Sequence, residues 1–412
     1  MRPIRFVLFV AAALFTFATS AHAQVPSEAS RARLREIYDH IVGMNTSVSG
    51  AQTPAMAAYL ASVFRDAGFP ESDIHVLPYG ATASLVVRYR GDGSGGRPIA
   101  FLAHMDVVEA RRSDWQRDPF TLIEENGYFY GRGALDVKGG VATLTETFLD
   151  LHDAGFRPTR DLILYFSGDE ETSGLTTIET LRLHRDLVDA EFALNADAGG
   201  GSLSETNGAP LSYALQTAEK TFASFALTAH NAGGHSSQPR PDNAIYDIVD
   251  ALTRVRAYQF PVQWNDTTIA SMRAAGAARH DALGRAMARF AAHPGDERAA
   301  AVLSSSPFAI GQIRTTCVPT LLQAGHADNA LPQTAIATVN CRIFPGVSIT
   351  SVQAKLQELA GAHIAIAPLD QYHSSDASPL RADVLDAWTQ AVHALDANVP
   401  IIPAMAAGAS DG

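Results

Sequence analysis

Residues 99–106 read Ile-Ala-Phe-Leu-Ala-His-Met-Asp, five apolar residues followed at once by a histidine and an aspartate. The apolar part is long enough for a strand that is buried on both faces. Similar short apolar runs occur around it at 85–89, 162–166 and 192–194. Helical patterns separate several of these runs, notably at 141–151. This alternation predicts an α/β domain with a largely parallel sheet.

Polar residues that can bind a metal follow the strand at 99–103. His104 and Asp106 are two residues apart, so on an extended segment both side chains point the same way. A His-x-Asp pair taken by itself is usually an ordinary loop pair. Asp136 lies in the glycine-rich stretch 131–140, where a tight turn leads directly into a helix. Taken alone, Asp136 is best interpreted as a helix N-cap.

Carboxylates also follow the next two predicted strands. Glu170 and Glu171 come after the strand at 162–166, and Asp197 comes after the strand at 192–194. Adjacent carboxylates repel one another unless a cation or solvent relieves them, so a solvated acidic turn is the alternative at 169–171. Taken together, four strand ends or following turns present a histidine or a carboxylate. This arrangement is typical of a divalent-ion site at one edge of a sheet.

Four motifs together resemble the M20 metallopeptidase family. They are His-Met-Asp-Val-Val at 104–108, the Gly-Arg-Gly…Asp…Lys-Gly-Gly block at 131–140, Asp-Glu-Glu at 169–171 and Gly-Gly-His-Ser-Ser-Gln-Pro at 233–239. The match runs in order from His104 to Gly412. The family contains carboxypeptidases, dipeptidases, aminoacylases and desuccinylases. The resemblance implies a zinc-binding catalytic domain interrupted by a smaller lid domain that also dimerises.

The resemblance assigns metal ligands residue by residue. His104 would bind one metal, and Asp106 would orient its imidazole and fix its tautomer. Asp136 would bridge two metals, Asp197 would complete the first site, and Glu171 would bind the second. One or two divalent ions are implied, with zinc expected and cobalt or manganese as alternatives.

The resemblance also assigns catalytic and substrate-binding residues. Glu170 would be the general base that takes a proton from the attacking water and passes it to the leaving amine. His235 would reach the active site of the partner subunit and stabilise a developing oxyanion. Asn329 and Arg342 would contact the substrate, Arg342 through a bidentate pair with a carboxylate. From the residues alone, His235 is interpreted as a turn residue and Arg342 as a solvent-facing strand charge.

The sequence departs from the family pattern near its end. The family places a further metal-binding histidine well after the loop that resembles 408–412, and this chain stops at that loop. The second metal site is therefore expected to lack one ligand. Two functions follow as hypotheses: an M20-type hydrolase of peptides or N-acyl amino acids, or an inactive metal- or ligand-binding relative. Retention of Glu170 beside Glu171 favours the enzyme, because a metal-binding scaffold needs no uncoordinated base.

A composition change after about residue 212 predicts the inserted domain. Apolar and polar residues alternate at 337–343, which indicates a two-faced strand, and helical patterns occur at 245–252, 274–302 and 352–359. Ser378 and Pro379 then predict the start of a new helix. We expect a signal peptide at 1–23, a three-layer α/β catalytic domain at 24–212 and 378–412, and an inserted α+β lid and dimerisation domain at 213–377.

Length and composition limit the classes of function. A chain of 412 residues is long enough for two domains. Its formal net charge of −12, with no basic run, argues against a nucleic-acid partner. Its two cysteines, Cys317 and Cys341, are too few for a disulfide scaffold or a thiolate zinc site. They are expected either to form a single bridge or to be two buried thiols.

The N-terminus has the pattern of an export signal. Arg2 and Arg5 precede the apolar run 6–18, and Ala-His-Ala at 21–23 offers a small-x-small cleavage site. A membrane anchor is the alternative, but the run is shorter than the roughly 20 residues that a bilayer span needs. The chain is therefore expected to be periplasmic or secreted, without a stable membrane span after cleavage.

Overall fold

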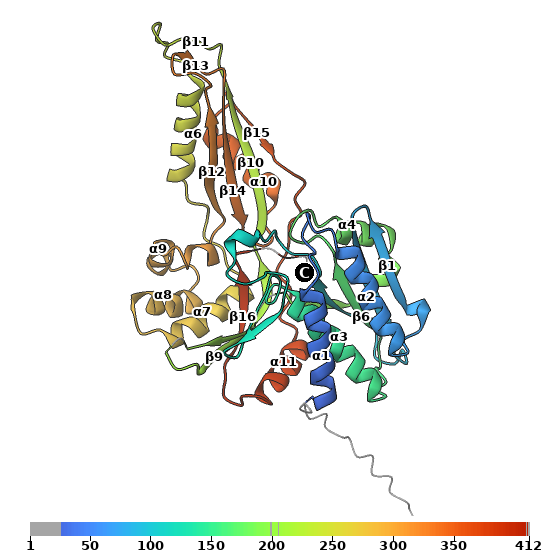
Figure 1. The fold of residues 1–412 in the computed structure, drawn as a ribbon. Helices are drawn as coiled ribbons and strands as arrows, with labels where there is room; N and C mark the ends of the chain where they lie inside the picture. The colour runs from blue at the N-terminus through green and yellow to red at the C-terminus, as the bar shows by residue number, and fades with distance from the viewer. Residues whose placement is uncertain (1–25, 198–199, 205, 409, 411–412) are drawn as a thin grey trace, which may run out of the picture.

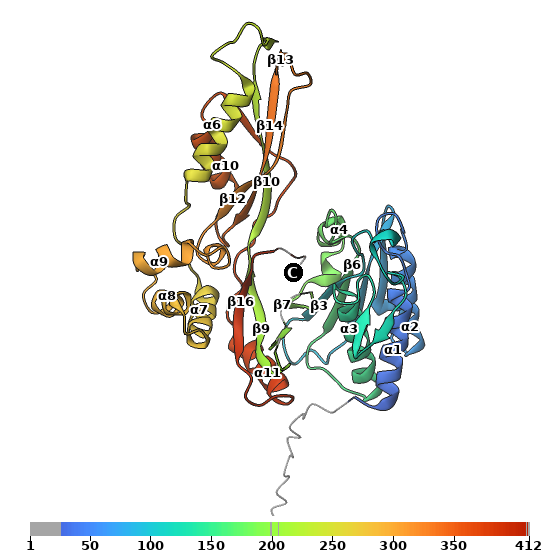
Figure 2. The same ribbon diagram turned by 60° about the vertical axis from the view of Figure 1, so that its left-hand side comes forward.

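The computed structural model describes residues 26–197, 200–204, 206–408 and 410. The expected signal peptide at 1–23 lies outside the described residues, as do Ala409, Asp411 and Gly412 of the loop at 408–412. The described chain forms a rounded body and a long arm that projects from it (Figures 1 and 2). None of the helices in these ranges is long and apolar enough to span a bilayer.

A five-stranded sheet forms the centre of the body. Its order is β1 (Ile74–Tyr79), β2 (Thr82–Tyr89), β6 (Leu162–Ser167), β3 (Ile99–His104) and β7 (Phe192–Asn195). β6, β3 and β7 are parallel, whereas β1 pairs antiparallel with β2 and β2 antiparallel with β6. The predicted largely parallel sheet is therefore mixed. A continuous apolar run shows that a strand is buried on both faces, but it does not show the strand's direction.

Helices cover both faces of this sheet, so the predicted three-layer α/β architecture is confirmed (Figure 1). One face packs against α1 (Glu28–Val42), α2 (Thr53–Asp66) and α3 (Lys138–Asp153). The opposite face packs against the segment of α4 (Leu175–Leu183) and α5 (Arg185–Val188). In β2, Leu85 and Val87 join the first cluster and Val86 joins the second. This alternation follows from the two-residue period of a strand.

A second, three-stranded sheet of the body has the order β16 (Ile401–Ala406), β9 (Pro210–Glu219) and β8 (Gly200–Leu203). Beside it lie α7 (Asp266–Ala278), α8 (Ala282–Ala292) and α9 (Glu297–Ser304), which form an apolar cluster of their own (Figure 2). The hydroxyls of Thr217 in β9 and Thr267 in α7 lie 2.7 Å apart. Residues 266–304 thus pack on the body, although they fall inside the segment 213–377 that we expect to form the lid.

The helix predicted to begin at Ser378 and Pro379 begins later. This helix, α11 (Ala382–His393), follows Arg381, which makes no capping hydrogen bond through its side chain. The predicted start was therefore wrong. The Ser378 backbone N–H instead donates to the carbonyl of Thr217, so the segment that leaves the arm pairs with β9 before the helix begins.

The arm is a four-stranded antiparallel sheet with helices on one face. Its order is β12 (Thr316–Ala324), β14 (Thr334–Ile343), β10 (Thr221–His230) and β15 (Ile364–Pro368), and its helices are α6 (Ala244–Ala257) and α10 (Ile349–Ala360). In β14 the odd-numbered residues are buried and the even-numbered ones are not, which confirms the predicted two-faced strand. Cys317 and Cys341 form a disulfide between β12 and β14, so the bridge is the correct alternative.

Short elements complete the chain. The arm ends in a two-stranded tip made of β11 (Gly234–His235) and β13 (Ala330–Leu331). A hairpin in the body joins β4 (Ile123–Glu125) to β5 (Tyr128–Tyr130). Single 3-10 turns occur in three places: η1 (Glu71–Asp73), η2 (Arg112–Asp114) and η3 (Ile310–Gln312).

Candidate metal centre

The carboxyl ends of the three parallel strands bring most of the predicted metal ligands together. His104 ends β3, Glu171 follows β6, and Asp197 follows β7. One ligand atom from each of His104, Asp136 and Glu171 lies within 4.8 Å of the others. His104 Nε2 is also 3.7 Å from Asp197 Oδ1. One imidazole nitrogen surrounded by carboxylate oxygens is a donor set that fits a zinc-class divalent ion.

Asp136 enters the site from the turn before α3. The residue at the N-cap position of α3 is Val137, which makes no capping bond, so Asp136 is not the helix cap that its local sequence indicates. Its carboxylate instead faces His104, with Oδ1 3.1 Å from Nε2. The Asp136 side chain is 65% exposed, whereas the His104 side chain is 1% exposed. Asp136 is therefore the most exposed of the predicted metal ligands.

Asp106 contacts both His104 and the turn that carries Glu170 and Glu171. Its carboxylate accepts hydrogen bonds from the backbone N–H groups of Glu170 and Glu171, each at 3.0 Å. His104 Nδ1 lies 3.0 Å from the Asp106 carbonyl oxygen and 3.5 Å from its carboxylate. One nearly buried carboxylate thus fixes the acidic turn and contacts the imidazole. Such support around a ligand is usual in metal sites.

Asp169, the first carboxylate of the Asp-Glu-Glu motif, binds the start of α4 instead. Asp169 accepts hydrogen bonds from the Ser173 hydroxyl, from the backbone N–H groups of Leu175 and Thr176, and from the Thr176 hydroxyl. It therefore anchors the first turn of α4. The repulsion expected among three adjacent carboxylates is reduced because this one lies apart, within a shell of donors.

Electrostatics at the centre favour the uptake of positive charge. Burial lowers the pKa of His104, but the carboxylates of Asp106 and Asp197 outweigh this effect and raise the pKa to about 12. Burial and the nearby Asp136 carboxylate raise the pKa of Glu171. His104 and Glu171 therefore hold protons more tightly than usual in the metal-free protein. A divalent cation would take the place of these protons and supply the positive charge that the carboxylates favour.

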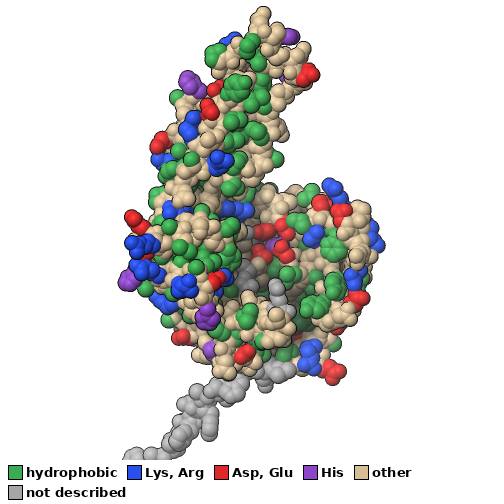
Figure 3. Space-filling view, turned by 90° about the vertical axis from the view of Figure 1, so that its left-hand side faces the viewer, with side chains coloured by type: hydrophobic (Ala, Val, Ile, Leu, Met, Phe, Trp, Pro, Cys, Tyr) green, Lys and Arg blue, Asp and Glu red, His purple; other side chains and the backbone are tan. Residues whose placement is uncertain are grey.

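Three of the predicted metal ligands, Asp136, Glu171 and Asp197, line a cavity of about 270 Å³ between the five-stranded and three-stranded sheets. Figure 3 shows acidic side chains gathered around a histidine in a hollow between the body and the base of the arm. The lining also includes Glu170, Gln216, Glu219 and Ser410. Glu219 accepts hydrogen bonds from the Gln216 amide at 3.2 Å and from the Ser410 hydroxyl at 3.0 Å. No sequence signal singled out Glu219, because it ends an ordinary strand.

A buried lysine supports the loop that carries Asp136. Lys138 is fully buried, and its Nζ donates to the Met44 carbonyl at 2.6 Å. A side chain at Gly133 would meet Lys138, because a Cβ there would lie 3.1 Å from its Cδ. Glycine and lysine in this motif therefore have a packing role in addition to the turn that the glycines permit.

Arg342 is the last but one residue of β14. The arrowhead end of β14 is its end nearest the body (Figure 1), so Arg342 belongs to the base of the arm. It is half-buried, and burial lowers its pKa. Lys220, between β9 and β10, is fully buried; burial and the charge of Arg342 lower its pKa to about 7. Within the described ranges neither cation forms an ion pair with a carboxylate. Arg342 therefore carries a positive charge without a described counter-ion, whereas the buried Lys220 gives up its proton more easily than an ordinary lysine.

His235 and Asn329, the predicted oxyanion-stabilising and substrate-binding residues, lie at the far end of the arm. His235 is opposite Ala330 in the tip, and the Ser236 backbone N–H donates to the Asn329 carbonyl at 2.9 Å. His235 Nδ1 lies 2.8 Å from the Ser237 hydroxyl. The tip is remote from the metal ligands of the same chain (Figure 2). The structure therefore brings His235 and Asn329 together but does not bring them to the cavity.

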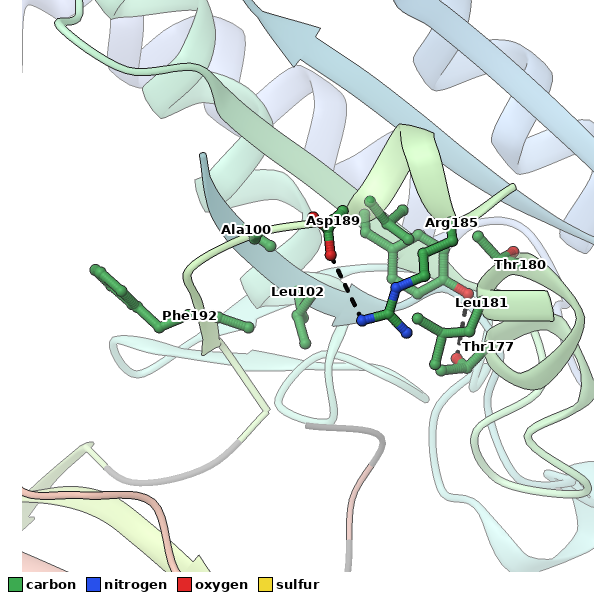
Figure 4. Close-up of a pocket in the computed structure, with 12 residues that line it drawn as sticks. Ala100, Leu102, Thr177, Thr180, Leu181, Arg185, Asp189 and Phe192 are labelled. Atoms are coloured by element: carbon green, nitrogen blue, oxygen red, sulfur yellow. Dashed lines mark hydrogen bonds and ion pairs between the residues drawn. The ribbon is translucent and has the colours of Figure 1, made fainter. Parts of the chain in front are cut away.

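A second cavity, of about 250 Å³, lies on the opposite face of the five-stranded sheet, under α4 and α5 (Figure 4). Its lining is largely apolar and includes Ala100, Leu102 and Leu181. Its two charged residues, Arg185 and Asp189, pair with each other at 3.5 Å. Among the described residues this cavity holds no cluster of metal-binding side chains. The predicted metal ligands lie instead at the strand ends.

The family model for peptidase family M20/M25/M40 matches residues 100–411. The chain belongs to this family. The M20 match begins in β3 and includes all of the candidate metal ligands described above. The predicted family resemblance is therefore confirmed.

Individual relatives are more distant. The N-fatty-acyl-amino acid synthase/hydrolase PM20D1 of Xenopus tropicalis is 27% identical over 80% of this chain and 65% of its own length. The probable carboxypeptidase S-like 2 of Dictyostelium discoideum is 29% identical over 66% of this chain and 53% of its own length. This M20 chain thus spans less than two thirds of either curated relative.

The fold of the M20 chain resembles that of solved structures. An M20 family metallo-carboxypeptidase from Sulfolobus solfataricus aligns with a TM-score of 0.67 and 16% sequence identity. The alignment covers 92% of this chain and 87% of the other. At this identity the likeness shows the shared fold of body and arm.

Proposed function

We propose that this chain is a metal-dependent hydrolase that cleaves a peptide or N-acyl amide bond beside a free carboxylate. One observation carries the proposal: His104, Asp136 and Glu171 offer ligand atoms close enough together to hold a metal ion, and Glu170 lines the same cavity as Asp136 and Glu171. A carboxylate next to a metal site but outside its ligand set is suited to general base catalysis.

The residues of the chain have separate tasks in this proposal. His104, Asp136, Glu171 and Asp197 would hold one or two ions, with zinc as the expected metal. When bound, a zinc-class ion polarises the scissile carbonyl and lowers the pKa of water. Glu170 takes a proton from the attacking water and delivers it to the leaving amine. Asp106 keeps the Glu170–Glu171 turn in register with His104 through its two backbone hydrogen bonds.

The charges on the two sides of the hollow support a carboxylate-bearing substrate. The cavity is lined by carboxylates, whereas Arg342 puts positive charge at the arm base. A peptide with its amide at the metal centre and its terminal carboxylate at Arg342 matches both charges, which favours a carboxypeptidase or dipeptidase. The alternative substrate, an N-acyl amino acid, has the same amide and carboxylate, and the PM20D1 relative supports this alternative.

A homodimer through the arm is part of the proposal. β12 is at the edge of the arm sheet, and its Val318, Leu321 and Leu322 are 55%, 60% and 57% exposed. On α6, which lies beside β12, Tyr246 and Val249 are 58% and 46% exposed. An exposed apolar edge strand next to an exposed apolar helix face is suited to pairing with a second copy. Such a dimer would give His235 of the tip a partner site to reach.

Export to the periplasm or beyond is also proposed. The Cys317–Cys341 disulfide supports it, because disulfides persist mainly in oxidising compartments. The basic and apolar pattern at 1–23 gives independent support.

The test combines metal content with hydrolysis of a panel of dipeptides and N-acyl amino acids. The parent chain is compared with Glu170→Gln and with Glu36→Gln, a matched change at an exposed position of α1. We expect all three to bind zinc and only Glu170→Gln to lose turnover, by about 100-fold or more. A folded, zinc-loaded parent with no turnover on the panel would refute the enzyme and favour an inactive metal- or ligand-binding relative.

A further inference from the structure

Phe222 lies directly beside Arg342 on the arm sheet. The two are register partners in β10 and β14, and Thr316 of β12 is the partner of Arg342 on its other side. Directly paired residues of neighbouring strands point to the same face of a sheet. Phe222 and Arg342 therefore share the face opposite α6 and α10, because the next residue, Ala223, is buried against those helices.

The Arg342 guanidinium lies over the ring of Phe222, which we call the Phe222 shelf. The guanidinium carbon lies 4.8 Å from the ring centroid. The Arg342 side chain makes no hydrogen bond or ion pair with any described residue, so the contact with the Phe222 ring is what orients it. Tyr372 meets the Phe222 ring edge-on, with centroids 5.7 Å apart, and so restricts the orientation of the Phe222 ring.

Part of the shelf is open to solvent. Phe222 is 38% exposed, although its ring is held between Arg342 and Tyr372. Phe225, three residues further along β10, is fully buried in the helix-covered core, so Phe222 is not part of that core. An aromatic side chain that is fixed in place and partly exposed beside an unpaired cation is suited to contact a ligand that is both anionic and apolar.

The shelf is near the metal cavity. Phe222 is three residues along the chain from Glu219, which lines that cavity. Three residues of extended chain span about 10 Å. Lys220, between them, donates to the Arg314 carbonyl at 2.8 Å and fixes the segment that leads to Thr316. Phe222 is therefore at most about 10 Å from Glu219 at the cavity, a distance that a peptide-sized substrate can span.

We propose that Phe222 determines specificity for the substrate residue that bears the free carboxylate. Its ring positions Arg342 for the carboxylate, and its exposed part packs against the side chain of the same residue. Aromatic and large aliphatic residues are therefore preferred over glycine at this position. The inference rests on the proposed function, since it assumes that Arg342 receives the carboxylate of the substrate.

The expected preference is measurable. Packing of a large apolar side chain against Phe222 should favour phenylalanine over glycine by roughly tenfold in kcat/KM, mainly through KM. Phe222→Leu removes the flat ring face, and Phe222→Tyr keeps it. Phe156→Leu is the matched control, because Phe156 is 45% exposed and lies outside the cavity lining.

The experiment measures hydrolysis and binding separately on the full chain. Hydrolysis of Ala-Gly, Ala-Leu and Ala-Phe is measured with the zinc-loaded parent and the three variants. Binding of glycine, L-phenylalanine and L-phenylalanine amide to the metal-free proteins is measured by calorimetry. Thermal unfolding monitored by circular dichroism shows that each variant is folded.

We expect the parent, Phe222→Tyr and Phe156→Leu to prefer phenylalanine about tenfold in both assays, and Phe222→Leu to bring the ratio to about two or less. The amide should bind weakly in all proteins. An unchanged ratio in folded Phe222→Leu would overturn the inference and leave the proposed function intact. Selective binding of L-phenylalanine without turnover of any dipeptide would support the inference and count against the proposed hydrolase.

Discussion

Metal binding should release a proton from His104. In the metal-free protein burial lowers the pKa of this histidine, but Asp106 and Asp197 raise it to about 12. The imidazole is therefore protonated at neutral pH, and it must be neutral to bind a metal. An ion that enters between His104, Asp136 and Glu171 thus has to displace this proton.

The magnitude follows from the number of protons. Release of one proton per ion makes the apparent association constant rise about tenfold for each pH unit between pH 6 and 9. The pKa of Glu171 is also raised, first by burial and then by the Asp136 carboxylate, so the dependence becomes steeper at acidic pH. Metal affinity should therefore increase throughout this range as pH rises.

His104 also makes the stability of the metal-free protein depend on pH. This stability falls as pH rises, whereas the metal affinity increases. Because the folded pKa of His104 lies above the ordinary value of 6.5, its stabilising contribution is complete below about pH 6.5. It is lost as pH rises toward about 12. The slope is at most about 1.4 kcal/mol of unfolding free energy per pH unit. Zinc should therefore stabilise the fold more at pH 8 than at pH 6.

Isothermal titration calorimetry with zinc in buffers of different ionisation enthalpy counts the released protons directly. We expect about one proton per ion at pH 8 in the parent, and weaker binding without this release in His104→Ala. Binding heats that do not depend on the buffer, with an affinity that does not change between pH 6 and 9, would refute the electrostatic argument.

Three further predictions concern the support of the site and the arm. Asp106→Ala, which removes the acceptor for two backbone N–H groups, should weaken zinc binding about 10- to 100-fold in a chelator competition, and unchanged affinity would contradict its positioning role. Replacing Cys317 and Cys341 with serine removes a bridge between residues 24 apart. The unfolding free energy measured in urea should fall by about 3 kcal/mol, and a loss below about 1 kcal/mol would contradict this contribution of the bridge. Leu322→Glu on the exposed edge strand should shift sedimentation from dimer to monomer, and a parent that is already monomeric would end the dimer proposal.

The sequence predicts the layers and the metal-binding edge because both depend on local patterns. Apolar runs identify β3, β6 and β7, and a histidine or carboxylate follows each of them, so parallel pairing alone brings His104, Glu171 and Asp197 together. Strand direction is not encoded in such runs, so the sequence predicts a largely parallel sheet although β2 pairs antiparallel with β6. The start of α11 was misplaced because pairing of Ser378 with β9 outweighs the local preference for a helix start after it.

Other features depend on tertiary contacts that one sequence does not reveal. Asp169 and Glu170 are neighbours with similar side chains, yet one anchors α4 and the other lines the cavity. Glu219 ends β9, which pairs with β16 in a separate sheet, so its place in the cavity depends on how the two sheets pack. The Phe222 shelf under Arg342 depends on the register between β10 and β14, which distant segments of the chain set together.

The most direct test of the metal centre is X-ray diffraction from zinc-soaked crystals of the full chain, recorded above and below the zinc absorption edge. The account predicts an anomalous peak within about 2.0–2.2 Å of His104 Nε2 and a carboxylate oxygen of Asp136, with Glu171 or Asp197 completing the site. A peak elsewhere, or no peak among these residues at saturating zinc, would contradict the central claim that this edge of the sheet is a metal centre.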